Sequence, residues 1–333
     1  IPMGNDIEVE WVSWKNDDRL LVGLLKDGES ENPLGRAVAV DRDGKNLVAL
    51  FSNVSRFKGN RDLSGVENRL PNDPTSVLMG AREAPRISAD GVAGNTLGVH
   101  NLYRVDVYSG RAEIVQRGQR ATFNWLTDPQ GVARVRWDYQ WDYGRIAIFV
   151  RNASTDKWEM LTTYGVYDLP PIEFRGFTND PNIAIVASNE KSDKFGIFEY
   201  NLDTRTLGKA IFQHPDVDVG HQIADDIGGP IYDTTSGKFV GIFFINEVWE
   251  HHYFDAQLKG IQDTLNAAFT QSALVRPTSL SRDRSRVIVT TSGPRDPATY
   301  YAFDATKNTA RRLGRRNAGL PEAELGASLV IKY

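Results

Sequence analysis

Few residues of this chain have the types and spacing that enzymatic chemistry requires. A serine nucleophile of the G-x-S-x-G type is absent, since Gly326-Ala-Ser-Leu-Val lacks the second glycine. Cysteine is absent as well, which excludes thiolate catalysis, disulfide bonds and Cys-ligated zinc. No glycine-rich phosphate or dinucleotide loop is present. The sequence therefore predicts no catalytic residue, no metal and no cofactor, and we expect the isolated chain to hydrolyse no peptide, ester or amide.

Histidines are the next candidates, because they ligate zinc and move protons. His251 and His252 are adjacent, so in a strand they point to opposite faces and do not converge on one ion. We interpret them as histidines at the rim of a loop beside Trp249. His214 and His221 lie in a segment with four carboxylates, where a divalent cation is the alternative to the solvated loop that we favour.

Aspartates recur along the chain with a regularity that could suggest a catalytic ring. They stand 50 to 56 residues apart, at Asp17, Asp73, Asp128, Asp180, Asp233 and Asp283. Each is followed by a short apolar run, and a second aspartate marks a turn further on, at positions 41, 106, 156, 203, 255 and 304. Regular recurrence at turns indicates side-chain to backbone hydrogen bonding in hairpins, and we prefer that interpretation to catalysis.

The elements around these turns are best seen in the segment 173–212. A short apolar strand precedes Asp180, and the runs 183–187, 197–202 and 207–212 follow, with alternating apolar residues and turn residues between them. Period-two alternation with β-branched and aromatic residues is typical of strands. The segment therefore predicts a four-stranded antiparallel meander.

Six units of this kind predict an all-β fold, a β-propeller of four-stranded antiparallel blades over residues 11–314. The first hairpin turn of each blade is expected at its marker aspartate. The one helical candidate of any length is 254–268, whose apolar spacing suits an amphipathic helix. We expect it as an insertion in place of an outermost strand.

Long connections should carry the binding groups, because loops on a rigid scaffold usually do. Two polar connections, 52–73 and 80–101, and the shorter loops 188–194 and 246–252 are expected to crowd one face. The net charge of −4 with interspersed signs predicts no nucleic-acid partner, and no apolar run reaches the length of a membrane span.

Several segments resemble the N-terminal propeller of the prolyl oligopeptidase family of serine peptidases. The similarity extends to the bacterial dipeptidyl-peptidase and acylaminoacyl-peptidase-like branch, which includes lasso-peptide isopeptidases. It is carried by the segments 14–22, 102–111, 123–131, 215–219 and 237–242, and above all by 281–304. This resemblance implies a propeller over 1–319, with six visible units and a seventh in the intact protein, and a crossing segment, 320–333, towards an α/β-hydrolase domain. The catalytic Ser, Asp and His would belong to that domain, in the same or a companion chain.

The resemblance also implies a function, gating the access of short or flexible peptides to the hydrolase domain. In related dipeptidyl peptidases an acidic propeller loop holds the amino terminus of the substrate. We therefore expect substrate contacts from two loops, at Arg82, Glu83, Arg86, Glu247, Trp249 and Glu250. The alternative is a free-standing propeller that binds a peptide, protein or glycan without catalysis, its ring closed by pairing 7–11 with 328–331.

Overall fold

The structure is a computed structural model of the chain. It describes residues 6–26, 34–52, 57, 60, 62–83, 98–152, 154–221, 228–246, 248–270, 272, 274–316, 319–320 and 324–326. The chain divides into two compact units. Unit 1 comprises Ile1–Ile185 and Glu199–Gly208, and unit 2 comprises Val186–Phe198 and Lys209–Tyr333.

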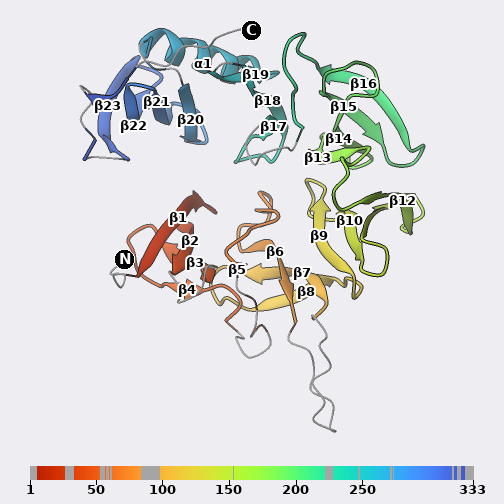
Figure 1. Ribbon diagram of the computed structural model, residues 1–333. Helices are drawn as coiled ribbons and strands as arrows, with labels where there is room; N and C mark the ends of the chain where they lie inside the picture. Colours follow the sequence, from red (N-terminus) through yellow and green to blue (C-terminus); the bar gives the residue numbers. More distant parts are fainter. Residues whose placement is uncertain are drawn as a thin grey trace. The chain divides into compact units, whose positions relative to one another are not determined.

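Sheets follow one another along the chain, and strands adjacent in sequence pair with each other, with one exception in the first sheet (Figure 1). We call these sheets blades one to six in chain order. Blade one comprises β1 (Ile7–Trp14), β2 (Arg19–Lys26), β3 (Leu34–Asp41), β4 (Val48–Ala49) and β5 (Asp62–Leu63). Blade two comprises β6 (Ser76–Arg82), β7 (His100–Asp106) and β8 (Ala112–Gln116). Blade three comprises β9 (Thr122–Thr127), β10 (Ala133–Gln140), β11 (Arg145–Arg151) and β12 (Trp158–Gly165).

The later blades repeat this meander. Blade four, whose residues are divided between the units, comprises β13 (Glu173–Phe177), β14 (Ile183–Ser188), β15 (Gly196–Asn201) and β16 (Thr206–Phe212). Blade five comprises β17 (Gly228–Tyr232), β18 (Phe239–Asn246) and β19 (Val248–Tyr253). Blade six comprises β20 (Leu274–Leu280), β21 (Arg286–Gly293), β22 (Asp296–Asp304) and β23 (Thr309–Arg315). The predicted fold class, a β-propeller built from antiparallel blades, is confirmed.

All six marker aspartates lie in the turn between the first and second strand segments of a blade, as predicted. Asp128 illustrates their role, because its Oδ1 accepts hydrogen bonds from the backbone N–H groups of Gln130 (3.0 Å) and Val132 (2.9 Å). Equivalent bonds to backbone N–H groups two or three residues on are made by Asp73, Asp180, Asp233 and Asp283. These carboxylates therefore stabilise hairpin turns, and the interpretation as turn residues is confirmed for them.

Blades one and two depart from the regular pattern in the connection 52–73. The outer strand β4 has only two residues, because Phe51 adopts φ +59° and turns its ring into the core, where it is 2% exposed. The connection is not simply a polar loop, since β5 within it pairs in parallel with β3. The first strand of blade two is reduced to the bridge between Asn68 and Leu78.

Blade five has three strands, and helix α1 (Ala256–Ala268) follows where a fourth would stand, as predicted. The side chain of Asp255 accepts a hydrogen bond from the N–H of Leu258 (2.9 Å) and so caps the helix. Leu258, Ile261 and Leu265 form its buried stripe, and the last two pack in the core of blade six. Among the described residues, no helix has the length and apolar character needed to span a bilayer.

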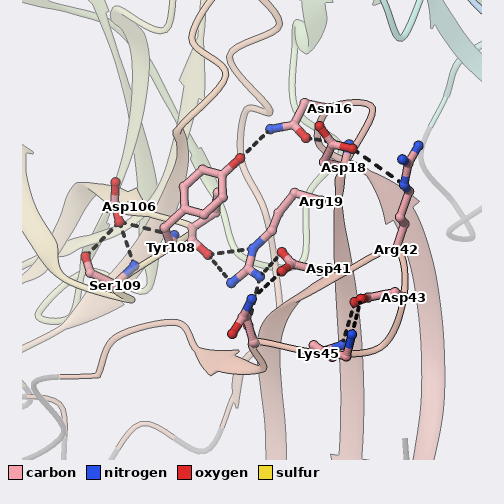
Figure 2. A network of polar contacts seen from close by, with 12 residues as sticks. Asn16, Asp18, Arg19, Asp41, Arg42, Asp43, Lys45, Asp106, Tyr108 and Ser109 are labelled. Carbon is pink, nitrogen blue, oxygen red and sulfur yellow. Dashed lines mark hydrogen bonds and ion pairs between the residues drawn. The ribbon is translucent and has the colours of Figure 1, made fainter.

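A buried arginine joins blades one and two within unit 1 (Figure 2). Arg19 of β2 is 1% exposed, and its Nε and Nη2 donate to the carbonyl oxygen of Val107 at 3.0 and 2.7 Å. Its Nη1 donates to Asp41 Oδ1 (2.6 Å) and to the carbonyl of Asn46 (2.8 Å). The ring of Tyr108 lies 5.0 Å from the guanidinium. One side chain thus satisfies polar groups of both blades at their contact.

Candidate functional site

The predicted substrate-binding residues of unit 1 lie at the end of β6. Arg82 is the last residue of that strand, and its Nη1 donates to the carbonyl of Gly98 (3.0 Å). Its backbone N–H donates to Asn60 Oδ1 (2.9 Å). The end of the strand is therefore tied to two neighbouring connections. Arg86 lies outside the described residues.

Glu83 follows Arg82 and is anchored from the core. Its Oε1 accepts a hydrogen bond from the hydroxyl of Tyr103 (2.8 Å), a side chain that is completely buried. The Tyr103 ring makes edge contacts with Phe51 and Phe57, at centroid distances of 5.6 and 5.1 Å. A rigid aromatic cluster thus fixes the position of one carboxylate oxygen. Such a carboxylate is suited to accept further hydrogen bonds from a cationic group.

The predicted substrate-binding residues of unit 2 lie in a strand and not in the expected loop 246–252. Residues 248–253 form β19, because rings recur at every second position, at Trp249, His251 and Tyr253, and the whole segment pairs with β18. Trp249 stacks on Phe243 of β18 (centroids 5.4 Å, planes 19° apart). Glu250 leaves the other face, and its Oε1 accepts from Asn246 Nδ2 (3.0 Å). Glu247 lies outside the described residues, and the substrate role of the six residues stays a prediction.

The adjacent histidines also lie in β19, on opposite faces as predicted. His251 stacks on Tyr253 (6.0 Å, 9°), whereas His252 contacts Phe212 (4.9 Å). The expectation of a loop rim is wrong, because both residues are paired in the sheet. His221 is likewise not solvated: it is 3% exposed and stacks on Phe195 at 4.0 Å.

A cavity of about 260 Å³ lies between blades five and six, within unit 2. It is bounded by the end of β17, by β18 and β19, by the first turns of α1, by β20 and by the turn that follows it. Its lining residues are Pro230, Ile231, Tyr232, Asp233, Thr234, Thr235, Val240, Phe243, Trp249, His251, Tyr253, Leu258, Arg276, Pro277, Thr278, Ser279, Leu280, Ser281, Arg282 and Arg284. Trp249 is the predicted site residue that belongs to it.

The arginines of this cavity differ in whether a carboxylate compensates their charge. Arg284 is neutralised, since its Nη2 contacts Asp233 Oδ2 and its Nη1 contacts Asp255 Oδ1, both at 2.9 Å. Arg276 of β20 is exposed and makes no hydrogen bond or ion pair with a residue that the structure describes. Of the described lining residues, three are arginines and one, Asp233, is a carboxylate. The cavity therefore carries an excess of positive charge.

Two titratable side chains of the cavity are shifted by their surroundings. Burial, and then the positive charge of Arg276, lower the pKa of His251 to about 4. Burial raises the pKa of Tyr253 to about 12, against the opposing effect of Arg276. Both groups are consequently uncharged at neutral pH and offer neutral hydrogen-bonding atoms. Among the described residues, no cluster of three or more His, Asp or Glu is arranged to hold a metal ion.

Sequence reasoning missed this cavity, because its lining is spread over residues 230–284 in two blades and a helix. One signal was present in the sequence, the alternation Trp249-x-His251-x-Tyr253, which places three rings on one face of a strand.

Comparison with known proteins identifies the fold. The sequence matches no protein-family model, and no curated protein sequence matches it. The structure is similar to that of a puromycin-hydrolysing peptidase from Mycobacterium tuberculosis, with a TM-score of 0.50 and 12% identity over 95% of this chain and 55% of that chain. Apo prolyl oligopeptidase B from Galerina marginata matches with a TM-score of 0.49 and 10% identity, over 96% of this chain and 44% of that one.

A propeller that was solved as a separate domain also matches. The β-propeller domain of the Trilobed protease from Pyrococcus furiosus gives a TM-score of 0.44 and 7% identity, over 94% of this chain and 85% of that chain. The chain spans less than half of a prolyl endopeptidase that it matches, 43%. The resemblance to propellers of the prolyl oligopeptidase family is thus confirmed as a likeness of fold.

Proposed function

We propose that this chain is the propeller portion of a prolyl oligopeptidase family serine peptidase, in which it gates the access of short or flexible peptides to a catalytic α/β-hydrolase domain. The observation that carries the proposal is the propeller fold, which aligns 95% of the chain with 55% of a puromycin-hydrolysing peptidase. The remaining length of such a peptidase is where the catalytic serine would reside. Gating would be steric, because a propeller placed over a catalytic domain admits only peptides that can pass it.

Glu83 is the residue that we assign to the amino terminus of the substrate. Its carboxylate is held by the Tyr103 hydroxyl, so little side-chain entropy would be lost when an ammonium group binds. A charge-assisted hydrogen bond to that carboxylate would be stronger than one between neutral groups. Arg82, Arg86, Glu247, Trp249 and Glu250 complete the proposed set of substrate contacts.

The test begins with the protein as it is encoded, purified from its source and treated with a fluorophosphonate reagent that labels active serines. We expect the label on a serine beyond residue 333, and we expect cleavage of short peptide anilides. The same peptide sequence placed inside a rigid folded host should resist cleavage, whereas an unfolded variant of that host should be cut.

The matched control is residues 1–333 alone, for which we expect neither labelling nor turnover. A reading frame that stops after Tyr333, together with no labelling and no cleavage, would refute the peptidase proposal and favour the free-standing binding propeller. Equal cleavage of the folded and unfolded hosts would refute steric gating while leaving the peptidase assignment intact.

A further inference from the structure

Rings cover one face of blade five and form a wall of the cavity in unit 2. Phe243 pairs with His251 across the strands, so their side chains share a face with Trp249 and Tyr253. Trp249 stacks on Phe243, and His251 stacks on Tyr253 with planes 9° apart. Gly241 pairs with Tyr253, and an added Cβ there would lie 2.6 Å from the His252 carbonyl oxygen and 3.1 Å from Tyr253 Cδ1. The glycine therefore lets the backbone of β19 and the Tyr253 ring lie close to β18.

The two faces of this sheet are covered to different degrees. On the opposite face, Ile242 and Phe244 are 0% and 3% exposed, and Phe244 packs against Phe212 at 5.0 Å. The rings on the cavity face all remain partly exposed. Uncovered aromatic surface in a concave site gains free energy when an apolar group covers it. The ring wall is accordingly a surface for a planar apolar ligand.

Opposite the rings, β20 supplies the positive charge. The Arg276 guanidinium has no hydrogen-bonding or ion-pair partner among the described residues. Its positive charge acts to lower the pKa of both His251 and Tyr253. Arg284, which also lines the cavity, is already paired with Asp233 and Asp255. An unpaired guanidinium is well suited to bind a carboxylate through two parallel hydrogen bonds.

The volume of the cavity limits the size of the ligand. Pockets for drug-sized ligands usually measure about 300–1,000 Å³, and this cavity of about 260 Å³ lies just below that range. It has room for one aromatic residue with its carboxylate, but not for a dinucleotide or an oligosaccharide. The hydroxyl group of Ser279, which lines the cavity together with Arg276, can bond polar atoms near the carboxylate, whereas the hydroxyl of Thr278 already donates to the carbonyl of Ile288 (3.1 Å).

We propose that the cavity between blades five and six binds a small aromatic carboxylate, with the ring on the surface of Phe243, Trp249, His251 and Tyr253 and the carboxylate on Arg276. Two sources present this chemistry, a free N-acylated aromatic amino acid and the C-terminal aromatic residue of a peptide. The site lies within unit 2 and does not depend on the proposed function.

The experiment compares an acid with its neutral analogue on the intact chain. N-acetyl-L-phenylalanine and N-acetyl-L-phenylalaninamide are titrated by calorimetry and by saturation-transfer NMR. The acid should bind about tenfold more tightly than the amide, as expected for one charge-assisted contact. In Arg276→Gln the affinity for the acid should fall to the affinity for the amide. Arg311→Gln, which removes an exposed charge on β23 outside the cavity, should bind like the wild type.

A variant in the ring wall tests whether the rings contribute to binding in addition to the charge of Arg276. Tyr253→Leu should weaken both probes by a similar factor, because it removes stacking surface and leaves the charge. Near-ultraviolet circular dichroism confirms that each variant keeps its fold. A tetrapeptide ending in phenylalanine that binds at least as well as the acetylated amino acid would identify a peptide C-terminus as the ligand, and weaker binding would identify the free acid.

Two results would overturn the proposal. One is equal affinity for acid and amide in the wild type, or an unchanged preference in Arg276→Gln. The other is the absence of binding by every probe up to about 10 mM, the limit of even weak specific affinity.

Discussion

Replacing Arg19 by methionine should destabilise unit 1 far more than removing an exposed arginine of the same unit. The guanidinium is 1% exposed and makes four hydrogen bonds, to Val107 twice, to Asp41 and to Asn46. Methionine fills a similar volume but leaves these acceptors without their donor. Loss of one partner of a buried charged network costs about 3–5 kcal/mol. Because Asp41 is 27% exposed and can be rehydrated, we expect the lower end, about 3 kcal/mol.

Urea unfolding followed by circular dichroism measures this change, and hydrogen exchange locates it in blades one and two. Arg104→Gln is the matched control, since its ion pair with Asp73 (2.6 Å) involves an arginine that is 47% exposed. Exposed pairs contribute about 0–1 kcal/mol. If Arg19→Met lowers the unfolding free energy no more than Arg104→Gln does, the idea that Arg19 joins the two blades is wrong.

Three further predictions concern other parts of the chain. Gly220→Ala should lower the free energy of unfolding by about 1–3 kcal/mol, because Gly220 has φ +80° and its new Cβ would lie 2.3 Å from Ile197 Cδ1. Gly260→Ala in α1, which has open space around it, should instead raise the free energy of unfolding by about 1 kcal/mol. Urea unfolding measures both changes. His251 has a folded pKa of about 4, below the unfolded value of 6.5, so its unfolded state binds protons first. Wild-type stability should therefore fall between pH 6.5 and 4 relative to His251→Gln, and parallel pH profiles would contradict this. In the intact peptidase, Glu83→Gln should raise KM for substrates with a free amino terminus and spare blocked ones; equal effects on both would remove the assignment.

Much of the fold was readable from the sequence because propeller blades are made of local patterns. Turn aspartates such as Asp128 bond to N–H groups a few residues away, so their spacing exposes the repeat without knowledge of distant contacts. Helix α1 was equally predictable, since its apolar stripe and the capping Asp255 are local features.

The features that were missed depend on residues far apart in the sequence. The ring of Phe51 turns away from the strand and packs against Phe57 and against Tyr103, and the contact with Tyr103 of the next blade is not visible in the local sequence. The cavity of unit 2 joins residues of two blades, so the position of the β19 rings beside Arg276 of β20 becomes visible only in the structure. Trp249 was predicted to lie in a loop, because its neighbours in sequence are polar. The structure places it in the strand β19.

The order of strands within each blade also bears on how the chain folds. Apart from β5, which pairs in parallel with β3, the strands of each described blade pair with their neighbours in sequence, so the contacts inside a blade join neighbouring segments of the chain. Closing the short loops between neighbouring strands costs less chain entropy than bringing two blades together. Individual blades can thus form early, while contacts such as that of Arg19 with Val107, 88 residues apart, close later. Substitution of Arg19 should therefore accelerate unfolding much more than it slows folding.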